Sequence, residues 1–169
     1  LSHMNLIVDS CSDLFQFLTN LIISPDYSSG IKNTSIAIMN QLILKFSALF
    51  QPDSVEIFVF FANQLPNSEI HESLLSAISN MADIYGKNDD FAVQIYDFFL
   101  NDLPDPFAFI VIGTSYKGIK DHFAHTLLLN ELIEKFSNGF GSDDDFTRFN
   151  AFNYYNQLIP IFYNYDDDS

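Results

Sequence analysis

The sequence is poor in cysteine, in basic residues and in long apolar runs. Cys11 is the only cysteine, so no disulfide can form within the chain, and a secreted fold held by disulfides is excluded. Only 7 Lys and Arg residues face 22 Asp and Glu residues, which gives a formal net charge of −15. No apolar run reaches the roughly 18 residues that a membrane span requires, so we expect no membrane insertion.

The shortage of basic residues limits the partners. The few Lys and Arg residues are scattered along the chain, whereas phosphate binding depends on clusters of them. Nucleic acid and anionic membranes are therefore poor partners, and a protein partner with a basic surface or peptide suits the charge better. No signal peptide is recognisable, which favours a cytoplasmic or nuclear location.

Apolar residues, by contrast, are abundant enough for a sizeable core. They make up 48% of the chain, with 19 Phe and 8 Tyr, and each aromatic ring can bury roughly 150–250 Å². We predict a single folded domain over residues 5–165. Residues 1–4 resemble the remnant of an expression tag, and we expect the acidic residues 166–169 to fray.

One fourteen-residue stretch occurs twice. SVEIFVFFANQLPN (54–67) and AVQIYDFFLNDLPD (92–105) share seven of fourteen positions at a constant offset of 38. The apolar spacing in the first copy predicts a helix that is buried between neighbours, although EIFVFF alone would also fit a buried strand. Asp53 and Glu56 match a capping box at its start, and Pro66 and Pro104 end the two copies.

An amphipathic helix is predicted to follow the first copy and to form a hairpin with it. Asn67 or Ser68 caps this second helix, and Gly86 ends it. Asp89 or Asp90 caps the next helix. A fainter echo of the unit near the start predicts a partner helix at 33–50. The stretch from Pro106 is interpreted as two helices, at 106–117 and 119–137, although PFAFIVIGT would also fit a strand, and a last helix opens at 143–145.

A period of 38–43 residues built from paired helices indicates an α-solenoid. The motif FFxNxLP at 60–66 and 98–104 resembles the HEAT/armadillo class, over about residues 5–160. The resemblance implies an all-α fold of about seven to eight helices in stacked antiparallel hairpins. It also implies a non-catalytic scaffold that binds other proteins. TPR-like and helical-bundle arrangements remain open.

The chemical motifs are incomplete, so we predict that the chain is not an enzyme and uses no cofactor or metal. His122 and His125 share a helical face but lack an identifiable third ligand. Residues 143–147 resemble a calcium loop, yet Arg148 stands where that loop needs glycine. No complete phosphate loop and no GxSxG motif occurs.

We predict a partner-binding surface on the polar face of the hairpin's second helix. In the second copy Asp97 stands where the first has Val59, so that face should lie nearer to solvent or a partner. The candidate binding residues are Glu69, Glu72, Ser76, Asn80, Asp83 and Asp97.

Three other interpretations remain open. The chain could be a segment of a nuclear transport receptor of the importin-β or exportin kind, or a structural spacer in a large assembly. The aromatic residues near the C-terminus could bind a basic peptide beside the acidic 166–168, or pack on the array. These aromatic residues are Tyr154, Tyr155, Phe162, Tyr163 and Tyr165.

Overall fold

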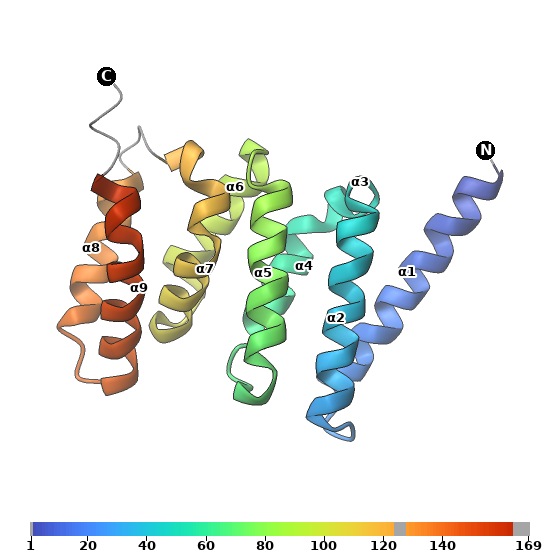
Figure 1. Cartoon of the computed structure of the whole chain (residues 1–169), viewed down its shortest axis with the longest axis horizontal. Coiled ribbons are helices and arrows are strands. Elements are labelled where there is room, and N and C mark those ends of the chain that lie inside the picture. Colours follow the sequence, from blue (N-terminus) through green and yellow to red (C-terminus); the bar gives the residue numbers. More distant parts are fainter. Residues whose placement is uncertain (1, 124–127, 164–169) are drawn as a thin grey trace.

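The computed structural model describes residues 2–123 and 128–163, and these are helical, with no β-strand among them (Figure 1). The all-α fold class is confirmed for this part of the chain. The predictions on His125, Tyr165 and the 166–169 tail, and on the side chain of Tyr163, lie outside the described residues. The α-helices are α1 (Ser2–Ile23), α2 (Ser29–Lys45), α3 (Ser47–Phe50), α4 (Ser54–Asn63), α5 (His71–Tyr85), α6 (Asp89–Asp97), α7 (Asp105–Phe123), α8 (Leu128–Phe140) and α9 (Asp145–Tyr163).

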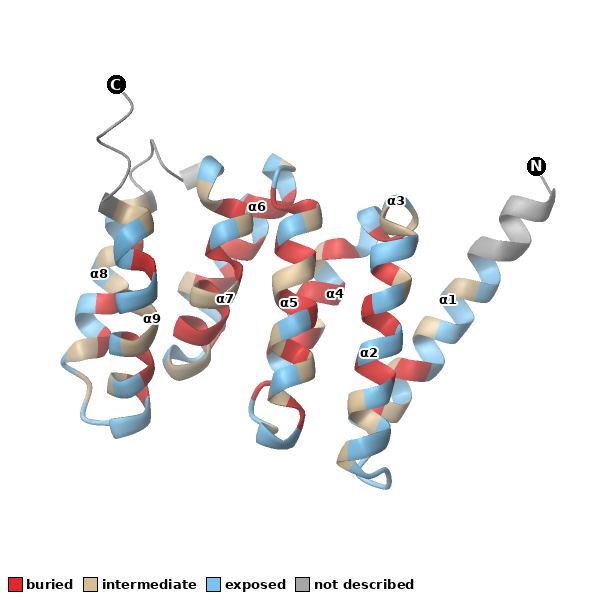
Figure 2. Ribbon diagram, in the orientation of Figure 1, coloured by how far each residue is buried: buried red, intermediate tan, exposed pale blue. Residues whose placement is uncertain are grey.

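The helices lie in a row that runs from α1 at one end to α8 and α9 at the other (Figure 1). α2, α5, α7 and α9 contact one another in that order and form a front layer. Behind them, α1 packs on α2, α4 on α5 and on α6, and α8 on α9. Buried positions concentrate on the helices in the middle of the row (Figure 2). The largest fully buried side chains are Phe58, Phe61, Phe99, Phe109 and Phe136.

The two copies of the repeated stretch take equivalent places. The first forms α4, and the second forms most of α6 and the π-helical turn η3 (Phe98–Asp102) that continues it. Three of their shared apolar pairs are buried in both copies, whereas Val93 and the shared prolines are exposed. The buried pairs are Ile57 with Ile95, Phe61 with Phe99, and Leu65 with Leu103. The helix prediction for both copies is confirmed, and the strand alternative is wrong.

Two predicted helix caps are wrong. Asp53 makes no capping hydrogen bond, because the 3-10 turn η1 (Gln51–Asp53) leads directly into α4, and Ser54 Oγ instead donates to Gln51 O at 2.8 Å. Asn88 caps α6, with its side chain accepting from Phe91 N at 3.0 Å. Asp89 and Asp90 already lie in the first turn of α6, where a negative charge favours the helix dipole.

Two predicted helix boundaries also differ from the structure. The expected helix 33–50 is divided at Phe46, whose φ of −125° and ψ of 41° are not helical, so α2 and α3 are separate. α9 contains Pro160 without a break, since the carbonyl that lacks a hydrogen bond there belongs to the exposed Asn156. The predicted helices 106–117 and 119–137 are instead α7, which runs unbroken past residue 118, and α8.

α7 contains Gly113 and Gly118 because its neighbours approach too closely for larger residues. A Cβ atom at Gly118 would overlap the backbone of Ala82 in α5, and one at Gly86 would overlap the backbone of Gly118. At Gly113 it would overlap the ring of Tyr154 in α9. The two glycines of α7 thus serve tertiary packing, which offsets their low helix propensity.

Polar side chains join α2 to α5 in a constant register. Ser73 Oγ donates to Asn33 Oδ1 at 2.7 Å, and Asn80 Nδ2 donates to Asn40 Oδ1 at 3.2 Å, each across 40 residues. The members of each helix are seven residues apart and therefore share a face. These pairs fix the alignment of the two helices.

Gly118→Ala is expected to destabilise the protein although alanine favours helix. The overlap with the backbone of α5 should lower the free energy of unfolding by about 1–3 kcal/mol, against a propensity gain of about 1 kcal/mol. Urea unfolding of both proteins, followed by circular dichroism, measures the difference. Gly30→Ala is the matched control, because a Cβ there meets only Ser28 Oγ at 3.8 Å. Equal stability of the two variants would contradict the packing argument.

Candidate functional site

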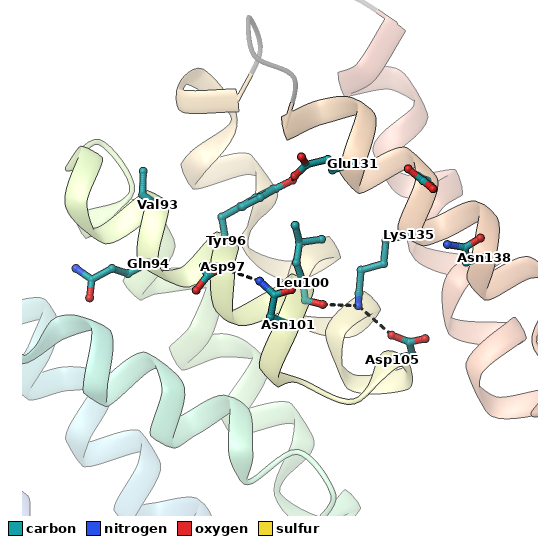
Figure 3. A pocket seen from close by; sticks show the side chains of 11 residues that line it. Val93, Gln94, Tyr96, Asp97, Leu100, Asn101, Asp105, Glu131, Lys135 and Asn138 are labelled. Carbon is teal, nitrogen blue, oxygen red and sulfur yellow. Dashed lines mark hydrogen bonds and ion pairs between the residues drawn. The ribbon is translucent and has the colours of Figure 1, made fainter.

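An open cleft of about 780 Å³ lies between α6–η3 and α8 (Figure 3). We call it the α6–α8 cleft. Its walls come from α6, η3, the first residue of α7, and α8, so segments distant in the sequence meet there. The lining residues are Val93, Gln94, Tyr96, Asp97, Leu100, Asn101, Asp105, Glu131, Glu134, Lys135 and Asn138.

Lys135 connects three of these segments. Its Nζ donates to Leu100 O at 3.3 Å and pairs with Asp105 Oδ1 at 2.9 Å, and only 14% of its side chain is exposed. The Leu100 carbonyl belongs to the C-terminal turn of the α6–η3 helix, where carbonyls lack helical partners and a cation is favoured. Lys135 thus fixes α8 against the end of one helix and the start of the next.

Tyr96 and Glu131 form the second bridge across the cleft. The phenol donates to Glu131 Oε2 at 3.1 Å, and Tyr96 is 6% exposed. Burial raises the pKa of Tyr96, and the hydrogen bond to Glu131 and the charge of that carboxylate raise it further. The phenol therefore stays protonated at neutral pH and remains a donor.

The cleft carries negative charge on partly apolar walls. Four carboxylates and one ammonium leave three net negative charges among the lining residues. Asp97 is exposed and accepts a hydrogen bond from Asn101 Nδ2 at 2.7 Å (Figure 3). Val93, 49% exposed, and Leu100 add apolar surface. Such a surface suits a cation on an aliphatic stem, as in lysine or arginine.

The structure divides the predicted binding residues between two places. Asp97 lines the α6–α8 cleft. Four of the others lie on α5 or the 3-10 turn η2 (Ser68–Ile70) before it, on exposed positions; these are Glu69, Glu72, Ser76 and Asp83. Asn80, expected on the same exposed face, is instead half-buried and bound to Asn40. The structure therefore does not bring Asp97 together with the α5 residues.

Sequence reasoning missed Glu131, Glu134 and Lys135. All three lie on α8, at i, i+3 and i+4, which places them on one helical face. That spacing alone could have indicated a charged face. Nothing in the sequence indicated that this face would oppose α6.

Other polar groups singled out in the sequence stabilise local structure. His122 Nδ1 lies 3.1 Å from Asp89 Oδ1, so it joins α7 to the start of α6. Asp144, in the segment that resembles a calcium loop, instead caps α9. Its Oδ2 accepts from Thr147 N at 2.7 Å and from Thr147 Oγ1 at 2.6 Å, and these bonds lower the pKa of the Asp144 carboxyl.

The chain was compared with protein-family models, curated proteins and solved structures, and nothing matches in any of the three. In the part of the chain that the structure describes, no group of three or more His, Cys, Asp or Glu residues is placed to hold a metal ion. None of the helices over 2–123 and 128–163 combines the length and apolarity needed to cross a bilayer.

Alkaline pH should destabilise the protein in part through Tyr96. The unfolded phenol ionises near its ordinary pKa of about 10, whereas the folded one stays protonated to higher pH. Its contribution to stability is complete below pH of about 10 and is lost as pH rises toward the folded pKa. Tyr85, whose pKa burial raises to about 12, acts in the same direction.

The measurement is urea unfolding of the wild type and Tyr96→Phe from neutral pH to about pH 11. The variant should lose less stability over the alkaline range, because phenylalanine has no proton to release. At neutral pH, the difference in the free energy of unfolding between the two proteins gives the cost of the lost hydrogen bond to Glu131. The alkaline change of each protein is then measured from its own value at neutral pH. An alkaline loss identical to that of the wild type would contradict the assignment.

Proposed function

We propose that this chain is a non-catalytic protein-interaction scaffold of the HEAT/armadillo type, and that it binds a basic segment of a partner protein in the α6–α8 cleft. The observation that carries the proposal is the cleft itself: an open, net-negative surface with apolar walls between two helices of the rear layer. Scaffolds of stacked helical hairpins commonly use the surface between successive units to bind other proteins.

The repeat part of the proposal is supported by the arrangement of the hairpins. α4 with α5 and α6 with α7 form successive hairpins, and each lies beside the next in both layers. Three apolar pairs that the two sequence copies share are buried at equivalent positions. The side-chain bonds that join α2 to α5 span 40 residues each, close to the sequence period. These features favour a solenoid over a closed bundle.

The nature of the partner follows from charge and shape. The chain carries −15 overall, which attracts basic partners at long range and accelerates their encounter. In the cleft, Asp97 is exposed on one wall and Glu134 on the other. A lysine or arginine side chain that enters between them is attracted by both carboxylates, while its aliphatic stem covers Leu100.

A Lys-rich peptide with intervening aliphatic residues should bind more tightly than a peptide of the same sequence with Gln in place of Lys. Fluorescence anisotropy of the labelled peptides measures both affinities. Affinity for the Lys peptide should fall as salt rises. Asp97→Asn and Glu134→Gln should each weaken binding up to about fivefold, because an exposed ion pair contributes roughly 0.2–1 kcal/mol.

Glu72→Gln and Asp83→Asn provide the matched control. They remove the same charge from the exposed face of α5, in the front layer. Unchanged affinity in these two variants, with weakened affinity in the cleft variants, supports the cleft. The opposite result would overturn the cleft assignment in favour of the α5 face. Equal binding of the Lys and Gln peptides would overturn the proposed basic partner.

A further inference from the structure

Exposed large apolar side chains gather on the two end helices of the front layer. On α2 these are Ile31, Ile38 and Leu44, and on α9 they are Phe146, Phe149, Phe152 and Ile159. The remaining ones lie on α1 and the segment after it, apart from Val93 on α6. α5 and α7, between the end helices, expose none. The layer is thus apolar on its surface at its two ends and not in its middle.

Acidic residues are almost absent from the same two helices; the exception is Asp145, the first residue of α9, which pairs with Arg148. The segments 27–52 and 146–165 contain no Asp or Glu, so all 22 acidic residues of the chain lie outside them. Together the segments hold two lysines and one arginine. In a chain with a net charge of −15, this leaves two surfaces that can approach another acidic molecule without direct like-charge repulsion.

The two surfaces differ in shape. The exposed side of α2 bears a hollow of about 600 Å³, where the small side chains of Thr34 and Ala37 lie between larger apolar ones. α9 instead carries projecting rings, of which Phe149 is 66% exposed. Phe152 is 51% exposed and stacks on Phe140 of α8 with ring centroids 4.4 Å apart, which fixes its position. The exposed face of α9 thus carries projecting rings, whereas the exposed face of α2 carries a hollow.

The layer itself indicates how such surfaces are covered. Within the chain, α2 is covered by α5, α5 by α7 and α7 by α9, and among the described residues α2 and α9 are the helices with an open side in this layer (Figure 1). An α9 helix placed against the α2 helix of another copy would extend the same succession. A second copy is therefore an occupant that offers a ring-bearing face to the hollow, and the acidic residue of that face, Asp145, is already paired with Arg148.

We propose that the chain self-associates head to tail, with the Phe146–Phe149–Phe152 face of α9 in one copy seated on the α2 hollow of the next. Such a contact joins two different surfaces, so it leaves a free α9 face at one end and a free α2 face at the other, and further copies can add. Neither surface overlaps the α6–α8 cleft, which lies in the rear layer.

Light scattering after size-exclusion chromatography, over a range of protein concentrations, tests the self-association. The mean mass should rise above the 19.3 kDa of one chain as concentration increases. High salt should strengthen the association, because it screens the net repulsion between copies while the apolar contact persists. A mass of one chain at every concentration and salt would overturn the proposal.

Two single variants test the direction of the contact. Phe149→Asp blocks the α9 face and Ile38→Asp blocks the α2 face, so each variant alone should remain monomeric. An equimolar mixture should form dimers and nothing larger, because the intact α9 face of one variant fits the intact α2 face of the other. Phe17→Asp is the matched control, since it places the same charge on an exposed aromatic site of α1, outside both faces, and should associate as the wild type does.

The alternative pairings give different results. If Phe149→Asp abolishes association and Ile38→Asp does not, α9 pairs with α9, and the head-to-tail contact is wrong. The reverse result would indicate an α2–α2 contact and would equally overturn it. Absence of dimers in the mixture also contradicts it. All these substitutions are at exposed positions, and circular dichroism should show unchanged helix content.

Discussion

The close approach of α5 and α7 is the contact on which the rest of the architecture depends. These two helices share the most extensive helix contact among the described residues, at the centre of the front layer. The approach requires glycine at Gly118, against the backbone of Ala82, and at Gly86, where α5 ends. Because α5 ends there, α6 starts after Asn88 in the rear layer. Its start is held to α7 by the His122–Asp89 pair.

The fold could be predicted wherever one helix's own pattern decides its structure. The apolar spacing of the repeated stretch and the cap at Asn67 are local signals, and the structure confirms both. The prediction of a helix break near Gly118 was wrong because helix propensity is a local quantity. Here glycine is required because the backbone of α5 lies too close for a larger residue. The cleft could not be predicted for a related reason. Tyr96 and Lys135 belong to different helices, and no sequence pattern indicates that these helices lie next to each other. Only the exposure of Asp97 was foreseen.

The acidic residues are unevenly distributed along the chain. The 22 acidic residues lie outside the segments 27–52 and 146–165, which form α2 and nearly all of α9, and four of them line the cleft. An even spread of acids would serve solubility equally well, so solubility alone does not account for two acid-free segments. Both segments form ends of one layer, and both expose apolar side chains. We therefore relate the lack of acidic residues in them to contacts with other molecules.

The differences between the two sequence copies explain how the end of α6–η3 comes to hold α8. In the first copy Ala62 is buried, and the chain turns after a short α-helix. In the second copy the π-helical turn lengthens the helix end, and Leu103 N donates to Phe98 O at 3.1 Å. The carbonyl of Leu100, the counterpart of Ala62, accepts from Lys135 instead. A changed helix end thus supplies the anchor for α8 and, beside it, the exposed Asp97. The shared residues build the repeated unit, and the substituted ones shape a surface on it.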